Sequence, residues 1–464
     1  MLALKCSEIL AAVRGVLLNG TPDAEITGVS IDSRKIMDGD LFIPIKGERY
    51  DGHDFIEQAV NSGAKAVLTS KDIKIDGGSI VVIKVNDTKK ALGDLAAYYR
   101  SKFNIPFIGI TGSVGKTSTK EMVACVLGQH LNTLKTMGNY NNEIGLPLSV
   151  LNLDSRYQAA VFEMGMNSFG EISRLTSIVK PDVAIITNIG MAHIEKLGSR
   201  QNILKAKLEI LEGLSKEGLV ILNGDDKLLS GMRGLLGFRT KYFGTEEEVD
   251  YKAENIRLAG EKGSYFEIRI DGVDYEIYVP APGIHNVYNA LAAIASGIEL
   301  NIPVDDIIKG IREYKPEKMR LNIIELKDIK IIDDTYNANP QSMEAALNVL
   351  KDVAGNSRKI AVLGDMLEMG EWADQAHYGI GKLAFSKGIN YIITVGNNAK
   401  KIAEGALNSG ANPENVKTFE NNAQGWNYLK ELIMSGDVIL VKGSRSMKME
   451  EIVNKLMTDR NTIQ

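Results

Sequence analysis

Residues 107–119 read Phe-Ile-Gly-Ile-Thr-Gly-Ser-Val-Gly-Lys-Thr-Ser-Thr and are the most informative part of the chain. Their apolar start is short enough for a buried parallel strand, and the glycine-rich turn after it leads into a predicted helix. Backbone N–H groups in such a turn hold phosphate oxygens, and the helix N-terminus adds its dipole. Lys116 would reach the β- and γ-phosphates, and the Thr117 hydroxyl would bind Mg²⁺. The segment therefore predicts a nucleotide-binding α/β domain.

The loop departs from the usual phosphate-loop spacing at one position. That spacing requires glycine where this chain has Ile110, so the match is to a shorter loop, Gly112-x-x-Gly115-Lys116-Thr117. The alternative is a glycine-rich turn between a strand and a helix, with an incidental lysine. The strand–loop–helix context favours the phosphate loop.

Short apolar runs alternate with helical segments on the C-terminal side of the loop. They end in Gly, Asn or Asp and cover residues 159–165, 182–190 and 218–226. This alternation predicts a parallel sheet with crossover helices. Residues 263–280 differ, because alternating apolar positions flank Asp271-Gly272. That pattern predicts an antiparallel hairpin at the edge of the same domain, followed by a helix over 286–297.

Both ends of the chain predict further domains. The first 85 residues contain strand-like runs at 29–34, 40–47 and 64–70, and a helix-like run over 88–99 leads to the loop. After Tyr314-Lys315-Pro316, three runs that end in Gly predict a second, smaller α/β sheet; they lie near 360–366, 391–397 and 438–444. A length of 464 residues also suggests about three domains, at roughly 150 residues each. We expect an α/β fold with an N-terminal mixed α/β domain (1–85), a central parallel-sheet domain (86–314) and a C-terminal α/β domain (315–464).

The composition excludes several classes of protein. The chain is 44% hydrophobic and 24% charged, with a net charge of −5, which argues against disorder, a nucleic-acid coat and a polybasic membrane binder. No apolar run approaches the ~18 residues of a membrane span, and residues 1–18 predict an amphipathic helix rather than a signal peptide. Cys6 and Cys125 have neither a metal-site spacing nor a disulfide framework. We expect a soluble cytoplasmic protein.

Two polar residues at strand ends are candidate metal ligands. Glu163 ends the apolar run of 159–162, where parallel strands direct side chains to a nucleotide crevice, and carboxylate oxygens suit Mg²⁺. His193 lies just beyond the run that ends at Gly190. A solvated strand-end carboxylate and a structural histidine are the alternatives.

The segment from Ser199 to Leu214 predicts a helix that carries a lysine within its apolar stripe. At ~100° per residue the stripe comprises Ile203, Leu204, Ile210, Leu211 and Leu214. Lys207 lies in the middle of the stripe, whereas Lys205 lies on the polar side. Burial would lower the pKa of Lys207 and favour a neutral amine, which can act as a base or form a carbamate, an oxygen ligand for Mg²⁺. The alternative is a lysine that extends past the stripe to water.

Together these residues resemble the Mur ligase family, ATP-dependent amide-forming enzymes of bacterial cell-wall synthesis. The resemblance covers essentially the whole chain and includes the loop 111–117, Glu163 in FEMGMNSFGEI, His193 in TNIGMAHIEKLGS and Lys207 in AKLEIL. It implies three domains: an N-terminal domain for a uridine nucleotide, a central P-loop ATPase and a C-terminal Rossmann-like domain. It also implies that Thr117, Glu163, His193 and a carbamylated Lys207 hold two Mg²⁺ ions.

Within the family, the chain most resembles the branch that adds D-alanyl-D-alanine to a UDP-N-acetylmuramoyl-tripeptide. The segments that carry this likeness are 31–55, 138–151, 282–293, 332–343, 362–370 and 441–453. The branch that adds a diamino acid typically has Asp-Asn-Pro-Arg in its last domain, and this chain has no such tetrapeptide. Val114 departs from the small polar residue of several members, which matters little if the loop binds through its backbone.

The resemblance implies a role for further residues. ATP would contact Gly112, Ser113, Val114, Gly115, Lys116, Thr117, Ser118, His285, Asn286, Asn289, Arg320 and Asp334. The UDP substrate would contact Ser33, Arg34, Lys46, Gly47, Asp51, His53, Asn139, Asn141 and Asn142. The dipeptide pocket would include Tyr336, Asn337, Asn339 and Ser342, and catalysis would depend on Lys116, Lys207, His193 and Arg320. The alternatives are a β-turn at Asp51-Gly52, a plain loop for the asparagine run, an N-cap for Asn286, and surface ion pairs for Arg320 and Asp334.

The implied reaction uses ATP and Mg²⁺, passes through an acyl phosphate and needs no protein nucleophile. Its partners would be the UDP-N-acetylmuramoyl-tripeptide and D-alanyl-D-alanine, with no nucleic acid and no membrane span, and a monomer is the family default. One rival is a folylpolyglutamate-type or other amino-acid-adding ligase of the same superfamily, which the first 85 residues disfavour. The other is a nucleotide-regulated binding module, which the additional metal-site candidates disfavour.

Overall fold

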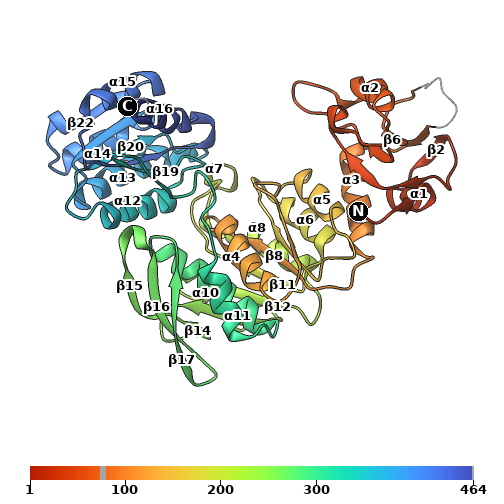
Figure 1. Cartoon of the computed structure of the whole chain (residues 1–464), viewed down its shortest axis with the longest axis horizontal. Helices are drawn as coiled ribbons and strands as arrows, with labels where there is room; N and C mark the ends of the chain where they lie inside the picture. The colour runs from red at the N-terminus through yellow and green to blue at the C-terminus, as the bar shows by residue number, and fades with distance from the viewer. Residues whose placement is uncertain (74–79, 462–464) are drawn as a thin grey trace. The chain divides into compact units, whose positions relative to one another are not determined.

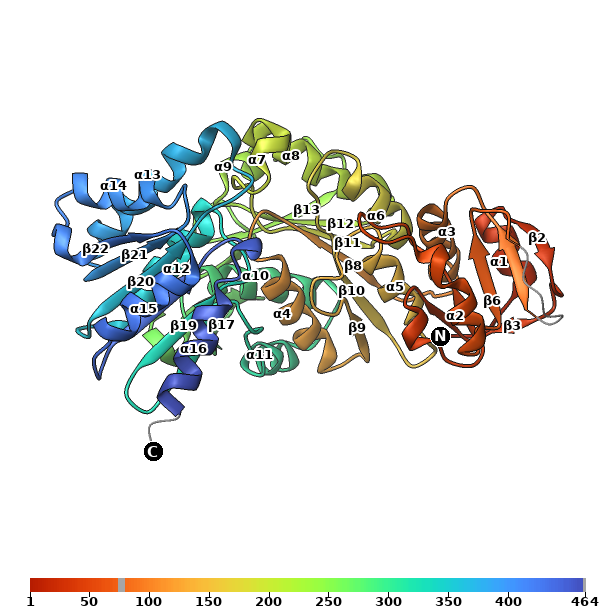
Figure 2. The same cartoon turned by 90° about the horizontal axis from the view of Figure 1, so that it is seen from above.

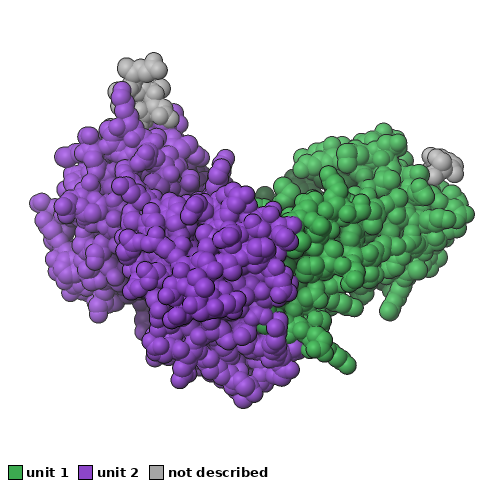
Figure 3. Space-filling view, turned by 60° about the horizontal axis from the view of Figure 1, so that its bottom comes forward, with its two compact units in different colours: residues 1–111, 131–184, 208–219 green, residues 112–130, 185–207, 220–464 purple. Residues whose placement is uncertain are grey.

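The computed structural model describes residues 1–73 and 80–461. These residues form two compact units, which are coloured green and purple in Figure 3. Unit 1 comprises residues 1–111, 131–184 and 208–219, and unit 2 comprises residues 112–130, 185–207 and 220–464. Among the residues that the structure describes, no helix is long and apolar enough to cross a membrane.

Unit 1 contains a mixed five-stranded sheet of order β2-β7-β6-β5-β4. The strands are β2 Val16–Asn19, β4 Gly28–Ser30, β5 Asp40–Phe42, β6 Ala66–Thr69 and β7 Val81–Lys84. β4 to β7 pair in parallel, and β2 pairs with β7 antiparallel. Phe42, Val67 and Val82 form its core together with the helix α2, Ile56–Asn61. The strands expected in the first 85 residues are therefore confirmed.

The helix expected over residues 1–18 is shorter in the structure. A short strand, β1 Leu4–Lys5, precedes the helix α1, Cys6–Val13, and β2 follows it. Arg14 ends α1 in the left-handed region, at φ 52°. At Gly15 a Cβ atom would lie 2.5 Å from Ile83 Cγ2. Close packing on β7 therefore turns the apolar residues after Gly15 into a strand.

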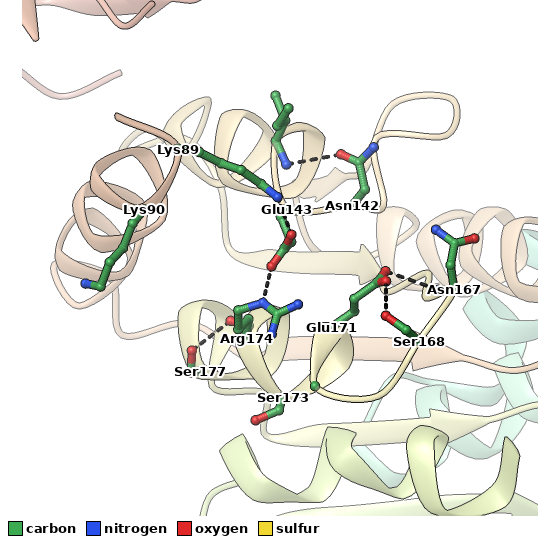
Figure 4. A network of polar contacts seen from close by, with 12 residues as sticks. Lys89, Lys90, Asn142, Glu143, Asn167, Ser168, Glu171, Ser173, Arg174 and Ser177 are labelled. Carbon is green, nitrogen blue, oxygen red and sulfur yellow. Dashed lines mark hydrogen bonds and ion pairs between the residues drawn. The ribbon is translucent and has the colours of Figure 1, made fainter. Parts of the chain in front are cut away.

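Unit 1 also contains three helices whose first turns bear charged or polar contacts. They are α3 Thr88–Arg100, α5 Gly145–Leu151 and α6 Glu171–Val179. The Asp87 carboxylate accepts the N–H groups of Lys89 and Lys90 and begins α3. Glu143, just before α5, pairs with Lys89 of α3 and Arg174 of α6 (Figure 4). The helix expected over 88–99 is confirmed.

The central sheet has seven strands in the order β14-β13-β12-β11-β8-β10-β9. They are β8 Phe107–Thr111, β9 Thr133–Lys135, β10 Ala159–Glu163, β11 Val183–Ile186, β12 Leu219–Asn223, β13 Arg239–Gly244 and β14 Tyr251–Lys252. β10 pairs in parallel with β8 and with β9, and β13 with β14. Every residue of β8, β10, β11 and β12 is buried, as expected of strands covered on both faces. The strands expected near 107, 159, 182 and 218 are confirmed, and those near 107 and 159 pair in parallel.

Unit 2 also contains several helices and a small antiparallel sheet. The helices are α4 Lys116–Gly128, α7 Ile194–Leu197, α8 Arg200–Leu208, α9 Lys227–Ser230, α10 Ile284–Glu299 and α11 Val304–Arg312. The expected hairpin forms from β16 Ser264–Ile270 and β17 Val273–Val279, with φ of 49° at Asp271 and 83° at Gly272. The hairpin does not extend the edge of the central sheet, because it joins β15 Glu254–Leu258 in a separate three-stranded sheet.

The helix expected over 199–214 ends early. α8 stops at Leu208, and Glu209–Gly213 form a 3₁₀ turn. In that turn the Glu209 carboxylate accepts the N–H groups of Gly170 (2.7 Å) and Ser173 (3.1 Å) at the start of α6. The Thr176 hydroxyl of α6 also donates to the Ile210 carbonyl at 2.8 Å. These contacts, far apart in sequence, override the local helical periodicity.

The last part of unit 2 is a six-stranded sheet of order β18-β19-β23-β20-β21-β22 (Figure 1). The strands are β18 Asn322–Glu325, β19 Lys330–Asp334, β20 Lys359–Gly364, β21 Tyr391–Val395, β22 Val416–Phe419 and β23 Val438–Lys442. All neighbours pair in parallel except β18 with β19. Figure 2 shows α13 and α14 on one side of this sheet and α15 and α16 on the other. The helices of this part are α12 Pro340–Ala354, α13 Ala373–Ser386, α14 Lys400–Asn408, α15 Asn422–Leu432 and α16 Glu450–Asn461. The second α/β sheet is therefore confirmed.

Candidate functional site

Two glycines shape the phosphate loop between β8 and α4. Gly112 has φ 153° and Gly115 has φ 85°, which side-chain-bearing residues rarely adopt. A Cβ atom on Gly112 would lie 1.9 Å from Thr187 Oγ1, and one on Gly115 would lie 2.7 Å from Asn289 Oδ1. Lys116 donates to the Gly112 carbonyl at 2.9 Å. The predicted strand–loop–helix is present, and both glycines are required by backbone conformation and by space.

A turn after β11, residues 187–191, holds the loop through its backbone. The Val114 N–H donates to Asn188 Oδ1 at 3.0 Å, and Asn188 Nδ2 donates to the Val114 carbonyl at 2.9 Å. The Ser113 N–H donates to the Asn188 carbonyl at 3.1 Å, and the Thr187 hydroxyl donates to the Val114 carbonyl at 2.6 Å. Sequence reasoning missed Thr187 and Asn188. Their position at the end of a parallel strand, like that of Glu163, was the available signal.

The N-terminal parts of α4 and α10 are linked by a side-chain hydrogen bond. The Thr119 hydroxyl donates to Asn289 Oδ1 at 3.1 Å, and Asn289 Nδ2 donates to Asn286 Oδ1 at 3.1 Å. Asn286 does not cap α10, because the capping residue is Gly283. Burial lowers the pKa of His285 to about 4, which keeps its imidazole neutral. These three predicted ATP contacts therefore lie beside the start of the phosphate-loop helix.

Lys207 lies on the buried side of α8. Its side chain is among the largest fully buried ones, whereas Lys205 is exposed. Burial holds the pKa of Lys207 well below its usual value, and the charge of Lys116 lowers it further. The alternative of a lysine that reaches water is therefore wrong. The neutral amine that carbamylation requires is favoured by this environment.

The other two candidate metal ligands differ in their surroundings. Glu163 is 1% exposed and accepts a hydrogen bond from Asn141 Nδ2 at 2.7 Å, so the solvated alternative is wrong. His193 has φ 62°, and its Nδ1 lies 2.5 Å from Glu368 Oε2. That contact orients the ring and leaves Nε2 as the other nitrogen available to a ligand. Glu368 is a further residue that sequence reasoning missed.

The donor atoms present are suited to Mg²⁺ bound with a nucleotide. Among the described residues, no group of three or more His, Cys, Asp or Glu side chains could hold a metal ion. Mg²⁺ sites in nucleotide enzymes typically use one or two carboxylates, phosphate oxygens and water, so such a group is not required. Thr117 and Glu163 offer oxygen atoms, and Lys207 would do so as a carbamate.

A buried ion pair lies at the end of β19. Lys442 Nζ donates to Asp334 Oδ2 at 2.6 Å and to the Asn337 carbonyl at 2.8 Å, and the Leu321 N–H donates to Asp334 Oδ1. Lys442 is 1% exposed and Asp334 8%, so a surface ion pair is the wrong description of Asp334. The Arg320 guanidinium lies 4.0 Å from the centre of the Tyr336 ring. Lys442 was missed as a site residue, although its segment was noted.

Two residues expected in the dipeptide pocket, Asn339 and Ser342, form hydrogen bonds with each other. Asn339 and Ser342 form a reciprocal capping box at the start of α12, with the Ser342 N–H donating to Asn339 Oδ1 at 2.9 Å. Nearby is a pocket of about 400 Å³ whose lining includes Met191, Pro340, Gln341 and Trp372. Pro340 and Gln341, which lie between Asn339 and Ser342 in the sequence, line this pocket. The four residues expected in the dipeptide pocket do not line it.

The residues expected to contact UDP lie in unit 1. Asp51 Oδ1 lies 2.7 Å from His53 Nδ1, and the Ser70 N–H donates to His53 Nε2, so Nδ1 carries the proton. Lys71 also contacts Asp51 and is the main cause of its lowered pKa. The remaining residues have local contacts: Ser33 with Gln58, Arg34 with Asp32, Lys46 with Asp51, and Gly47 with Tyr50.

The asparagine run 139–142 is a structured turn beside the end of β10. The Asn141 N–H donates to the Asn139 carbonyl at 2.7 Å, and the Gly165 N–H donates to the Asn141 carbonyl at 2.8 Å. The Asn142 side chain accepts the N–H groups of Ile144 and Gly145 at the start of α5. Because Asn141 also binds Glu163, the structure brings a predicted substrate residue and a predicted metal ligand together.

Comparison with known proteins identifies the family. Residues 25–100, 110–297 and 319–445 match, in order, the Mur ligase family catalytic domain, the Mur ligase middle domain and the Mur ligase glutamate ligase domain. The chain is 41% identical to UDP-N-acetylmuramoyl-tripeptide–D-alanyl-D-alanine ligase of Bacillus subtilis (strain 168), over 98% of this chain and 99% of that protein. The chain belongs to the Mur ligase family.

Solved structures support the same assignment. The crystal structure of MurF from Acinetobacter baumannii has a TM-score of 0.90 to this Mur ligase at 35% identity, over 98% of this chain and 99% of that one. MurF ligase from Thermotoga maritima in complex with ADP has a TM-score of 0.82 at 27% identity, over 94% and 98%. The expected three-domain α/β fold is confirmed. The boundaries near residues 85 and 314 stay predictions.

Proposed function

We propose that this Mur ligase joins D-alanyl-D-alanine to the UDP-N-acetylmuramoyl-tripeptide in cytoplasmic peptidoglycan precursor synthesis, with ATP as the energy source. The main support is the 41% identity, over nearly the full length of both chains, to a ligase of that name. The same name belongs to the ligase of Escherichia coli (strain K12), which is 36% identical over 98% of this chain. The phosphate loop, with both glycines in the required conformation, supports the use of ATP.

The reaction has two steps. A carboxylate oxygen of the tripeptide attacks the γ-phosphorus of ATP, the bond to the β-phosphate oxygen breaks, and ADP leaves. The free amine of D-alanyl-D-alanine then attacks the acyl carbon, loses a proton and expels phosphate to leave the new amide. Lys116 and Arg320 stabilise negative charge on the phosphoryl group during transfer. Closure of the C-terminal domain excludes water, which would otherwise hydrolyse the acyl phosphate.

We also propose a magnesium requirement, with two ions. Thr117, Glu163, His193 and carbamylated Lys207 would hold them, and Mg²⁺ bound there neutralises phosphate charge. The buried position of Lys207 supports this role, because a neutral amine is the form that reacts with carbon dioxide. The burial of Glu163 supports it as well, because a buried carboxylate needs cationic or hydrogen-bonding partners.

The remaining contacts are proposed by the same resemblance. His285, Asn286 and Asn289 would hold the adenine side of ATP, and Asp334 would bind the ribose. Tyr336, Asn337, Asn339 and Ser342 would shape the acceptor pocket, and the enzyme would act as a monomer. The UDP part would be bound by Ser33, Arg34, Lys46, Gly47, Asp51, His53, Asn139, Asn141 and Asn142.

The proposal is tested by phosphate release from ATP in the presence of the UDP-N-acetylmuramoyl-tripeptide, with and without D-alanyl-D-alanine. We expect release to need both substrates and the product mass to increase by the dipeptide less one water. Release with the tripeptide that does not respond to the dipeptide would keep the acyl-phosphate chemistry and overturn the assigned amine. Phosphate release from ATP that needs neither the tripeptide nor an amino donor, measured with both omitted, would support a nucleotide switch instead.

A further inference from the structure

Gly190 lies between the phosphate loop and the start of α12. A Cβ atom added to it would lie 2.9 Å from Gln341 Oε1 and 3.1 Å from Ser113 Cβ. No L side chain fits between these two neighbours unless one of them moves. The backbone at residue 190 therefore fills the space between a residue of α12 and a residue of the phosphate loop.

Hydrogen bonds connect the same three segments. Gln341 Oε1 accepts the N–H of Met191 at 3.2 Å, and the Gly190 N–H donates to Ser113 Oγ at 2.8 Å. Gln341 is the second residue of α12, and the capping box of Asn339 and Ser342 fixes the backbone on both sides of it. A displacement of Gln341 would thus be transmitted through these two hydrogen bonds to Ser113.

The turn that carries these contacts is held along its length. The Ile189 N–H donates to Asp226 Oδ2 at 2.7 Å, and Arg200 donates to the Ile189 carbonyl through Nε and through a terminal nitrogen. At its start, Asn188 makes two hydrogen bonds to the backbone of Val114. A turn restrained at every step transmits a displacement instead of absorbing it.

We propose that Gln341 is a positioning residue for the phosphate loop, acting through the turn 187–191 on Ser113 and Val114. Gln341 belongs to the segment 334–342, to which the proposed function assigns the ribose and dipeptide contacts. The contact therefore couples the acceptor side of the enzyme to the geometry of the loop that binds the ATP phosphates. The inference rests on the proposed function only in taking ATP as the ligand of the loop.

The test compares nucleotide affinity in the full-length protein. The dissociation constant of ADP with Mg²⁺ is measured by calorimetry for wild type, Gln341→Ala and Gly190→Ala, without tripeptide or dipeptide. We expect Gln341→Ala to raise it about 5- to 10-fold, the size of effect typical of residues that act through a contact network. Gly190→Ala should raise it at least as much, because its Cβ atom would lie 2.9 Å from Gln341 Oε1 and 3.1 Å from Ser113 Cβ, so that one of these neighbours must shift. If the two substitutions act through one contact, the double variant should bind ADP no more weakly than Gly190→Ala alone.

Gln424→Ala is the matched control. Gln424 also lies in the first turn of a helix, α15, and its Oε1 accepts a backbone N–H, that of Glu420, at 3.0 Å. Its ADP affinity should stay within about twofold of wild type, as for a surface change away from the site. Affinity for the UDP-tripeptide should be unchanged in all variants.

Two results would overturn the inference. One is an ADP dissociation constant for Gln341→Ala equal to that of Gln424→Ala. The other is a parallel loss of UDP-tripeptide affinity, which would indicate a general structural defect. If Gly190→Ala does not fold, Gln341→Ala decides alone. Because the ADP measurement needs no amine, a failure of the assigned dipeptide reaction would leave this comparison unaffected.

Discussion

Lys116 and Lys207 lie close enough within unit 2 for the charge of Lys116 to add to burial in lowering the pKa of Lys207. Two ammonium groups in a buried site repel, so the neutral form of Lys207 is favoured. A carbamate on Lys207 would replace this repulsion with attraction, because the modified group carries a negative charge. The relationship connects the phosphate loop with α8 and gives the buried lysine a chemical use.

Replacement of Lys207 by alanine should abolish nearly all ligase activity, because the carbamate proposed to form on its amine, and its oxygen ligand, would be lost. Short carboxylates such as formate or acetate, added at high concentration, should restore part of the activity by occupying the vacated space. Lys205→Ala is the matched control, since Lys205 is an exposed lysine on the same helix. Steady-state phosphate release, with and without added carboxylate, measures the effect. Full activity in Lys207→Ala would contradict a role at the metal site.

Replacement of Lys207 by methionine should stabilise the protein while abolishing activity. In the native state the pKa of Lys207 is held below the ordinary 10.5, so the native state binds fewer protons than the unfolded chain. Stability therefore rises with pH up to about the ordinary lysine pKa, and the burial cost is largest well below it. At pH 7.5, without bicarbonate, we expect Tm to rise by about 2–4 °C for each kcal/mol by which removal of the buried amine increases the free energy of unfolding.

The stability gain from Lys207→Met should shrink as the pH approaches 10. Differential scanning calorimetry at pH 7.5 and 9.5 makes the comparison, with Lys205→Met as the exposed control. A variant less stable than wild type at both pH values would show that Lys207 has favourable partners in the unmodified protein.

The pair of Lys442 and Asp334 should behave as a buried ion pair. Lys442→Met leaves the Asp334 carboxylate without the ammonium that lies 2.6 Å away and should cost about 3–5 kcal/mol. The double variant Lys442→Met/Asp334→Asn should recover a large part of this loss, because no buried charge is left unpaired. Lys455→Met, an exposed lysine of α16, is the control. Thermal unfolding of wild type, Lys442→Met, Asp334→Asn, the double variant and the control measures the coupling, and additive effects of the two single substitutions would argue against a paired contact.

His285 should make stability depend on pH in the acidic range. Burial and, to a smaller extent, Lys442 lower its pKa from 6.5 to about 4, against the opposing influence of Asp334. Between these values the unfolded chain binds a proton at His285 and the native state does not, so wild type loses stability as pH falls from 6.5 to 4.

The variant His285→Gln lacks this titration. Its Tm should therefore fall less than that of wild type between pH 7 and pH 4.5, by a few degrees on the scale expected for a domain of this size. Equal losses in both proteins would mean that His285 titrates alike in the native and unfolded states.

Local patterns were sufficient for most of the secondary structure. The strands near 107, 159, 182 and 218 and the hairpin at Asp271-Gly272 were predicted because apolar runs and turn residues act over a few positions. The errors occurred where distant contacts compete with local preference. Residues 209–213 leave the helix because Glu209 caps α6, and residues 16–19 form a strand because Gly15 packs on Ile83.

The lysine in the apolar stripe was correctly found from sequence, because helical periodicity alone places Lys207 on the same face as Ile203 and Leu204. The phosphate loop was found as well, since its glycines and Lys116 are contiguous. Whether Lys207 reaches water was not predictable, because that depends on which parts of the chain cover α8. In the structure the Lys207 side chain is buried and does not reach water.

The contacts that hold the site in shape are set by the tertiary structure. Asn188 binds Val114 across 74 positions, Lys442 binds Asp334 across 108, and Gln341 binds Met191 across 150. Each is a polar residue without an unusual local pattern, and its partner is chosen by the order of strands in a sheet and by helix packing. The chain's motifs thus identify a family and its chemistry, because the reacting groups are encoded in short contiguous segments. The residues that hold these reacting groups in place are known only from the folded structure, because a hydrogen bond requires proximity in space and not in sequence.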